Sequence, residues 1–443
     1  MRKKRTLFFA FVISVVSLII RMYEIETIPR NLNPDEADNL MTYIIESHNS
    51  TLPLIGINWN GAPLINNAIQ GFFWEISGES ISGLRFPSVL FSTLSVLLFF
   101  IIGLQITQNN ILSFCFAIAL STNAWFLNFS RSSWENIYTS IPVLIGIWAG
   151  IILYKKKNPN TALIFFVISS ILGFYSYHTG KFIPIASAIL CLGTLFIHKT
   201  KIMHRTRGMF FAACIIILVI SPQLLISIKD FQKASHRIAN VSIFNQANKV
   251  EIHNHVINNL RGFAFYDARS FHYGTWSRYV PPERPLIPPL VTLFYLIGIV
   301  FSFQKLRWLF LYFIILIIPV QILSYPTPDA ARAVHIVPVL YLFSLIGMHI
   351  SYKFFARLLN KKQQIFPHLL TGISCTMLLL TSVLEATTYF RWIQRTDIIE
   401  ARKPAIDYKE FSSWIKSVKE SAKTGRRFTI DEWHKEIFHR KEI

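Results

Sequence analysis

Two adjacent carboxylates, Asp35 and Glu36, stand in the stretch IPRNLNPDEADNLMTY, directly after the first apolar segment of the chain. A carboxylate beside low-dielectric lipid can act as a general base toward an acceptor hydroxyl or amine. Most such pairs are only solvated loop residues. Here Pro34 and Asp35 suit the first turn of a helix, and the pattern that follows is typical of an amphipathic helix. We therefore expect Asp35 to be catalytic, and Glu36 to be a second catalyst, a structural partner or a metal ligand.

Cations suited to a phosphate occur in short motifs elsewhere in the chain. Lys181 follows Tyr177 and His178 in GFYSYHTGKFIP, where a turn between two apolar spans requires only a breaker such as Gly180. Lys181 can bind a phosphate as a point charge. His178 could bind a phosphate, a sugar or a metal, although a lone histidine more often binds none of them.

Arg332 and His335 lie in SYPTPDAARAVHIVPVL, at the mouth of a predicted span and just inside it. A guanidinium is well matched to a phosphate, and ionisable residues inside spans are functional candidates by default. The alternative for Arg332 is snorkelling to the lipid headgroups. Arg131 and Glu135 lie four residues apart in NFSRSSWENIY, so on a helix they would share one face. They predict either a rim ion pair or a pair that turns Arg131 toward a phosphate.

Weaker candidates for the substrate pocket are Arg85 in SGLRFPSVLFS and the aromatic, basic loop FAFYDARSFHYGTWSRYV, which contains Arg261, Arg269, His272 and Tyr273. An acidic pair with several cations suits the transfer of a sugar from a lipid-linked phosphosugar, because cations stabilise the leaving phosphate. No Walker A or GxGxxG motif occurs, which favours a lipid-linked donor over a nucleotide sugar. The sequence contains no ligand set that compels a metal, so a divalent cation is neither required nor excluded.

The composition predicts an all-α polytopic membrane protein. Of the 443 residues 52% are hydrophobic and only 15% are charged, against about 25% charged in a typical soluble domain. The net charge of +20 would suggest nucleic acid as a partner in a soluble protein. Here the charge gathers in short clusters between apolar segments, so we expect a lipid bilayer as the partner and no nucleic acid. The four cysteines all lie in apolar runs without CxxC spacing, which argues against a disulfide framework or a zinc site.

Eleven apolar stretches approach bilayer-spanning length, namely 6–20, 84–104, 111–129, 137–154, 161–177, 182–197, 209–228, 286–303, 308–324, 333–350 and 369–384. With the basic N-terminus in the cytoplasm, alternation places every short basic loop on the same side. The opposite side receives the first outer loop (24–83), with two predicted amphipathic stretches, and a second large outer loop (229–285). Residues 1–388 form the predicted transmembrane domain. Residues 389–443 are either a small outer domain or a partly ordered tail.

The motifs resemble, in order and spacing over residues 28–348, a bacterial member of the C-type glycosyltransferase superfamily. Within it the chain is similar to the family 39, dolichyl-phosphate-mannose-protein mannosyltransferase-like group, which includes lipid A aminoarabinose transferases. The stretches that carry the resemblance are NPDEADNLMTYIIE, APLINNAIQGFFWEISGESISGLRFPSVLFSTLSVLL, NAWFLNFSRSSWENIYTSIPVL, ILGFYSYHTGKFIPIAS and PDAARAVHIVPVLYLFSLIG.

The resemblance implies the C-type glycosyltransferase fold, a polyprenyl-phosphate-sugar donor, an envelope acceptor and probable inversion at the anomeric carbon. It places the active site on the periplasmic or extracellular face of a bacterial inner membrane. It implies a catalytic role for Asp35, with Glu36 as support, and donor-phosphate contacts for Lys181 and Arg332. The lysine is a departure, because the family often has an arginine there. The short C-terminal tail is another, because many relatives carry a larger domain.

Two other classes of function remain open from sequence. A transporter or flippase of lipid-linked sugars would need the same cations but no outer general base. The polar residues gather at one face rather than at the midplane, and no internal repeat is visible, which favours an enzyme. An inactive scaffold would tolerate replacement of Asp35 and Arg332.

Overall fold

The computed structural model describes residues 2–29, 31–49, 54–58, 60–155, 158–197, 202–245, 253–255, 257, 259, 279–281, 284–324, 329–358, 365–394, 406–424, 426 and 429–439. Within these residues the regular structure is helical, and β-pairing is limited to three isolated bridges. The first half contains α1 (Arg2–Met22), α2 (Pro34–Asn49), α3 (Ile65–Ile76), α4 (Ile81–Thr107), α5 (Asn110–Thr122), α6 (Ala124–Ser130), η1 (Glu135–Thr139), α7 (Ser140–Tyr154), α8 (Pro159–Ser176), η2 (His178–Phe182) and α9 (Ile183–Ile197). The second half contains α10 (Ile202–Lys229), α11 (Phe231–Val241), α14 (Pro289–Lys305), α15 (Arg307–Ile317), η5 (Ile318–Ile322), α16 (Ala330–Ala333), η6 (Val334–Ile336), α17 (Val337–Leu358), α18 (Ile365–Ile393), α20 (Tyr408–Lys423) and α21 (Ile430–His439).

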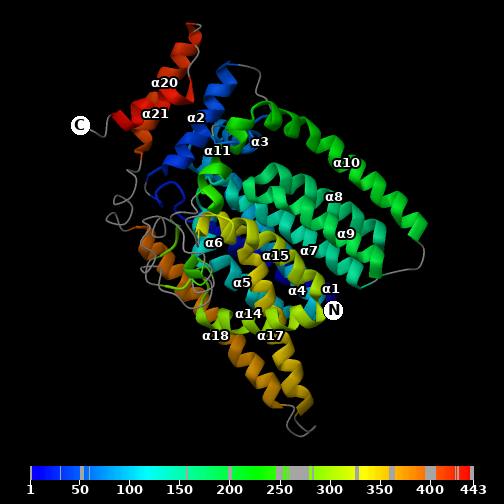
Figure 1. The fold of residues 1–443 in the computed structure, drawn as a ribbon. Helices are drawn as coiled ribbons and strands as arrows, with labels where there is room; N and C mark the ends of the chain where they lie inside the picture. The colour runs from blue at the N-terminus through cyan, green and yellow to red at the C-terminus, as the bar shows by residue number, and fades with distance from the viewer. Residues whose placement is uncertain are drawn as a thin grey trace.

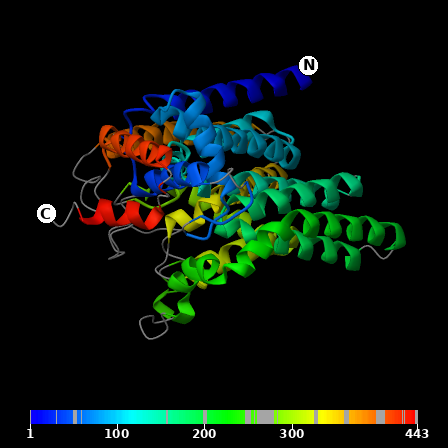
Figure 2. The ribbon, with the colours of Figure 1, turned by 90° about the horizontal axis from the view of Figure 1, so that it is seen from above.

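The long apolar helices form a bundle around α17, which packs against α14 and α4 (Figure 1). Of the most apolar residues in the span that contains α17, 89% are buried, whereas the value for α10 is 11%. Helices α1 and α10 lie at opposite edges of the bundle (Figure 2). An apolar helix that is exposed in the fold must find an apolar solvent, so this arrangement is that of a multi-pass membrane protein.

The predicted count of eleven spans is not reached among the described residues. Seven helices are long and apolar enough to cross a bilayer, and two bent pairs raise the number to nine at most. One predicted span is divided into α5 and α6, which meet at 64°. Helices α14 and α15 meet at 117°, and α9 has only 15 residues. Each predicted stretch is helical, but breaks shorten several of them below spanning length.

Both amphipathic stretches predicted in the first outer loop are helices, α2 and α3. They lie at one end of the bundle, with the C-terminal helices α20 and α21 beside α2 (Figure 1). The apolar face of α2 is buried against these neighbours in a core that includes Met41, Phe411 and Trp433. The isolated bridge between Leu32 and Ile406 joins the two segments through both of its backbone hydrogen bonds.

Residues 408–423 and 430–439 are therefore folded against the first outer loop. They are called the C-terminal cap below. The indole N–H of Trp74 in α3 donates to the Tyr408 hydroxyl at 2.9 Å, so the C-terminal cap is attached to α3 as well as to α2. Helix α18 passes through the predicted boundary at residue 388 and ends at Ile393.

Candidate active site

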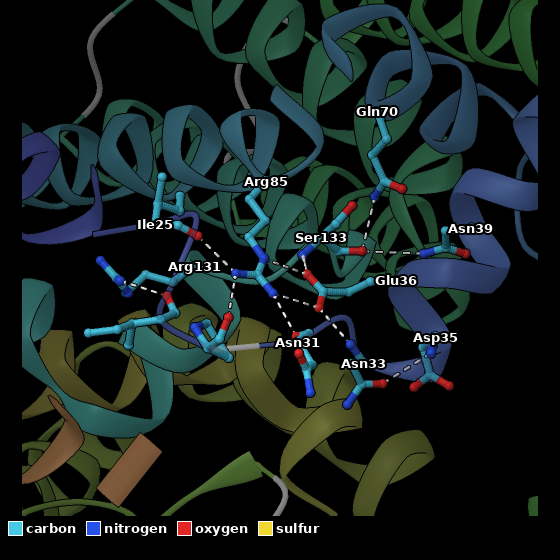
Figure 3. Close-up of polar contacts among 12 residues, drawn as sticks. Ile25, Asn31, Asn33, Asp35, Glu36, Asn39, Gln70, Arg85, Arg131 and Ser133 are labelled. Carbon is cyan, nitrogen blue, oxygen red and sulfur yellow. Dashed lines mark hydrogen bonds and ion pairs between the residues drawn. The ribbon is translucent and has the colours of Figure 1, made fainter. Parts of the chain in front are cut away.

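Glu36 and Arg85 form a buried ion pair that anchors the start of α2 to α4 (Figure 3). Their side chains are 1% and 0% exposed. Arg85 donates from Nε to Oε1 at 3.1 Å and from Nη2 to Oε2 at 3.2 Å. Glu36 also accepts the backbone N–H groups of Ser133 at 2.7 Å and Asn33 at 2.9 Å. Four donors thus occupy the two oxygens of Glu36.

Arg85 is equally saturated. Its two Nη atoms also donate to the carbonyl oxygens of Ile25, Pro29 and Asn31 at 2.8–3.1 Å. A guanidinium has five N–H donors, and all five are used within the protein. The structure therefore assigns Glu36 and Arg85 to anchoring the first outer loop. These contacts favour the structural-partner alternative for Glu36 and use the donors with which Arg85 would reach a substrate pocket.

Arg131 holds the chain that leaves α1. Its two Nη atoms donate to the backbone oxygens of Ile20, Arg21, Tyr23 and Ile28 at 2.6–2.9 Å. The carbonyls of Ile20 and Arg21 belong to the last turn of α1, where a helix leaves them without intrahelical partners, so the arginine caps α1. The carbonyls of Tyr23 and Ile28 belong to the chain that follows the helix, so the arginine also holds that chain. Burial lowers the pKa of Arg131. These contacts occupy both Nη atoms, whereas Nε is buried without a hydrogen-bond partner among the described atoms.

The predicted pairing of Arg131 with Glu135 is wrong. Helix α6 ends at Ser130, and η1 begins at Glu135, so no helical turn connects the two side chains. Glu135 instead accepts the Asn39 amide at 2.7 Å and is 4% exposed. This contact joins η1 to the second turn of α2.

Asp35 stands apart from this anchor. Its backbone N–H donates to the Asn33 side-chain oxygen at 3.0 Å, and its half-buried carboxylate points away from Arg85 (Figure 3). Successive side chains of a helix differ by about 100° in direction, so adjacent carboxylates face different neighbours. Asp35 lies within electrostatic range of Glu135 in η1.

Three short 3-10 turns, η1, η2 and η6, contact one another next to this end of α2. The Thr179 hydroxyl of η2 is 3.4 Å from Nδ1 of His335 in η6. The amide of Asn136 in η1 donates to the Ala331 backbone oxygen at 2.9 Å, one residue before Arg332. The turns therefore bring predicted residues from three distant parts of the chain to one end of the bundle.

Two cations of this region have different surroundings. Lys181 in η2 is half-buried, and it forms no ion pair with the described part of the chain. Burial lowers the pKa of Lys181. Arg332 is 8% exposed and is held by Asp329, with Nη2 3.3 Å from Oδ2, and by the Ser324 hydroxyl at 3.1 Å.

Of the remaining predicted residues, His178 and His335 lie in the turns of this region, and others lie outside the described part of the chain. The His178 ring meets the Tyr177 ring edge-on, with centroids 5.1 Å apart. Nε2 of His335 is buried without a hydrogen-bond partner among the described atoms, which marks a polar group available to a ligand. Tyr273, with Arg261, Arg269 and His272, lies outside the described residues. The described chain contains no cluster of three or more His, Cys, Asp or Glu side chains suited to a metal.

Sequence reasoning missed a set of buried amides beneath α2. Asn67 donates to the backbone and side-chain oxygens of Asn39 at 3.0 and 3.2 Å. Gln70 donates to the Ser133 carbonyl at 3.3 Å and to the Tyr138 hydroxyl at 3.2 Å. The available signal was the placement of Asn66, Asn67 and Gln70 on one face of an otherwise apolar helix.

Comparison with known proteins gives a match to one protein family over part of the chain. Residues 61–226, from the approach to α3 through most of α10, match the family described as dolichyl-phosphate-mannose-protein mannosyltransferase. The predicted family is confirmed. No curated protein matches.

The fold of the chain is similar to that of ArnT from Cupriavidus metallidurans. The apo crystal structure of ArnT matches with a TM-score of 0.50 and 10% identity, over 93% of this chain and 76% of ArnT. The structure of ArnT bound to undecaprenyl phosphate matches with a TM-score of 0.54 and 9% identity, over 94% and 77%. The predicted C-type glycosyltransferase fold is thereby confirmed. The family segment contains Arg85, Arg131 and Lys181 but neither Asp35 nor Arg332.

Proposed function

We propose that the protein is a membrane glycosyltransferase that moves a sugar from a polyprenyl phosphate to an envelope acceptor. The observation that carries this proposal is that the two adjacent carboxylates, Asp35 and Glu36, have different surroundings. Glu36 is paired with Arg85, whereas the Asp35 carboxylate points away from that pair. The family match and the fold shared with an undecaprenyl-phosphate-binding protein support a lipid-linked donor.

In the proposed reaction Asp35 accepts the proton of an acceptor hydroxyl or amine. The freed lone pair attacks the anomeric carbon as the bond from that carbon to the phosphate oxygen breaks. The sugar inverts, and polyprenyl phosphate leaves with the bonding electrons. Lys181 and Arg332 stabilise the negative charge that develops on the phosphate, in a water-poor site where such contacts are strongest. The active site faces the periplasm or the exterior, and the N-terminus lies in the cytoplasm.

The test compares Asp35→Asn with Glu46→Gln, a control at the other end of the same helix. Each purified variant is reconstituted with polyprenyl phosphate carrying a radiolabelled sugar and with envelope extract as the acceptor. We expect Asp35→Asn to fold and to bind undecaprenyl phosphate normally but to lose about 100-fold or more of its transfer rate, the contribution typical of a general base. Glu46→Gln should retain the wild-type rate.

Two results would overturn the proposal. Near-wild-type transfer by Asp35→Asn would show that Asp35 is not the general base. Labelled sugar-lipid that changes leaflet without loss of its sugar would identify a flippase. Lys181→Ala and Arg332→Ala provide an independent check, because both should weaken the binding of undecaprenyl phosphate while Asp35→Asn leaves it unchanged.

A further inference from the structure

A cavity of about 860 Å³ lies at the end of the bundle that carries the N-terminus. The N-terminus and the C-terminal cap occupy opposite ends of the molecule (Figure 2). From Lys4 to Arg21, helix α1 alone spans about 25 Å at 1.5 Å per residue, and Arg21 adjoins the carbonyls that Arg131 caps. The cavity is therefore remote from Asp35 and is not part of the candidate active site.

The cavity has an apolar part, formed by Ile111, Leu112 and Cys375, and a part lined by cationic and neutral polar groups. Lys4 and Arg5 contribute from α1, and the imidazoles of His349 and His368 contribute from α17 and α18. The chain segments that line it, residues 4–5, 107–112 and 349–375, contain no Asp or Glu. The two basic side chains thus have no carboxylate counterion on the cavity's own segments. A bound anion would supply the missing charge.

The surroundings of the cavity favour a lipid over a soluble anion. Next to the lining residues of α1, Leu7 and Phe8 are 70% and 62% exposed. On α18, Leu369 and Ile373 flank the lining residues Thr371 and Gly372 and are 56% and 49% exposed. In a membrane these apolar surfaces face acyl chains. A cationic hollow bordered by apolar helix faces matches a molecule with an anionic head and apolar tails.

Basic residues at a membrane boundary are commonly topological signals and need no ligand. That explanation accounts for Lys4 and Arg5 on the surface of α1. It does not account for a hollow that five helices, α1, α4, α5, α17 and α18, line beside them. The volume also lies in the range of about 300–1,000 Å³ that is typical of small-molecule sites.

We propose that this cavity binds the phosphate headgroup of an anionic membrane lipid from the leaflet at the N-terminal end of the bundle. Lys4 and Arg5 contact the phosphate, and Tyr352, His368 and Thr371 offer hydrogen bonds to the rest of the headgroup. The Tyr352 hydroxyl already lies 3.4 Å from Nδ1 of His368, so the two groups are placed to act together. The bound lipid would join α1 to α17 and α18.

The first test is a lipid titration of the purified full-length protein followed by native mass spectrometry. We expect phosphatidylglycerol to bind at a saturable site that phosphatidylcholine does not fill. The variant Lys4→Gln/Arg5→Gln should weaken this binding by about tenfold or more, since each basic group near a lipid surface contributes appreciably. The matched control Lys305→Gln/Arg307→Gln removes two cations from another helix junction and should bind as the wild type does.

The second test blocks the cavity without a change of charge. A Cβ atom at Gly372 would meet nothing within 4 Å, so Gly372→Leu can extend into open space without a backbone clash. We expect Gly372→Leu to lose the saturable phosphatidylglycerol site while its unfolding temperature stays near that of the wild type in detergent. Wild-type binding of phosphatidylglycerol by both Gly372→Leu and Lys4→Gln/Arg5→Gln would overturn the proposal. Displacement of the lipid by millimolar inorganic phosphate would also overturn it and would identify a soluble-anion site.

Discussion

Replacement of Glu36 by alanine tests whether this carboxylate anchors the fold or takes part in chemistry. The substitution removes the acceptor of two charge-assisted hydrogen bonds from Arg85, which is 0% exposed. It also orphans the buried backbone N–H of Ser133. Removal of one partner from a buried ion pair costs about 3–5 kcal/mol. Arg85 keeps three carbonyl acceptors, so we expect a loss of about 3–4 kcal/mol, toward the lower end of that range.

The measurement is reversible unfolding in mixed detergent micelles, in parallel with the transfer rate of the folded fraction. Arg426→Ala is the control, because the pair of Arg426 with Glu432 is 64% and 39% exposed. Exposed pairs contribute about 0–1 kcal/mol, so this variant should be nearly as stable as the wild type. A Glu36→Ala protein that is as stable as the wild type but inactive would refute the anchoring role and assign Glu36 to catalysis.

Three further predictions follow from single contacts. Burial lowers the pKa of Lys181, so its positive charge is lost as pH rises through this lowered value. A plot of kcat/KM for the anionic donor against pH should therefore begin to decline at a lower pH than that at which an ordinary lysine titrates. Lys181→Arg should shift this decline to higher pH. Trp433→Phe removes the indole N–H bond to Asp38 at 2.9 Å and should destabilise the cap by about 1.5–3 kcal/mol, visible as faster hydrogen exchange in α20 and α21. Arg131→Ala should cost at least about 3 kcal/mol of stability through its four lost carbonyl contacts, while its folded fraction binds undecaprenyl phosphate normally.

The helices of the bundle could be predicted from the sequence because apolar length is a strong local signal. Even the cap left a trace, since Phe411, Ile415 and Val418 recur at helical spacing in a segment that otherwise looks polar. The breaks were less predictable. The break between α14 and α15 falls at the junction predicted between 303 and 308, but the predicted stretch 111–129 gave no sign of the 64° break at Asn123 that divides it into α5 and α6.

The roles of the cations could not be predicted for a different reason. Arg85 and Glu36 are 49 residues apart, and no local pattern indicates which acid an arginine will meet. Arg131 binds backbone carbonyls, which carry no side-chain signature at all. The expected pairing of Arg131 with Glu135 assumed one continuous helix, whereas α6 ends between them at Ser130 without a glycine or proline to mark the end.

The first turn of α2 explains why one carboxylate of the acidic motif is set apart from the others. Glu36 points to Arg85 in the bundle, and Asp38 accepts the Trp433 indole N–H and lies 3.3 Å from Nε2 of His434 in the cap. Because successive helical residues differ by about 100° in direction, the contacts of Glu36 and Asp38 lie on different sides of α2. Rotation of the helix about its axis would therefore break at least one of them. The Asp35 carboxylate points in another direction, away from Arg85. The anchoring acids thus fix the orientation of the third, which is the preorganisation that a general base requires.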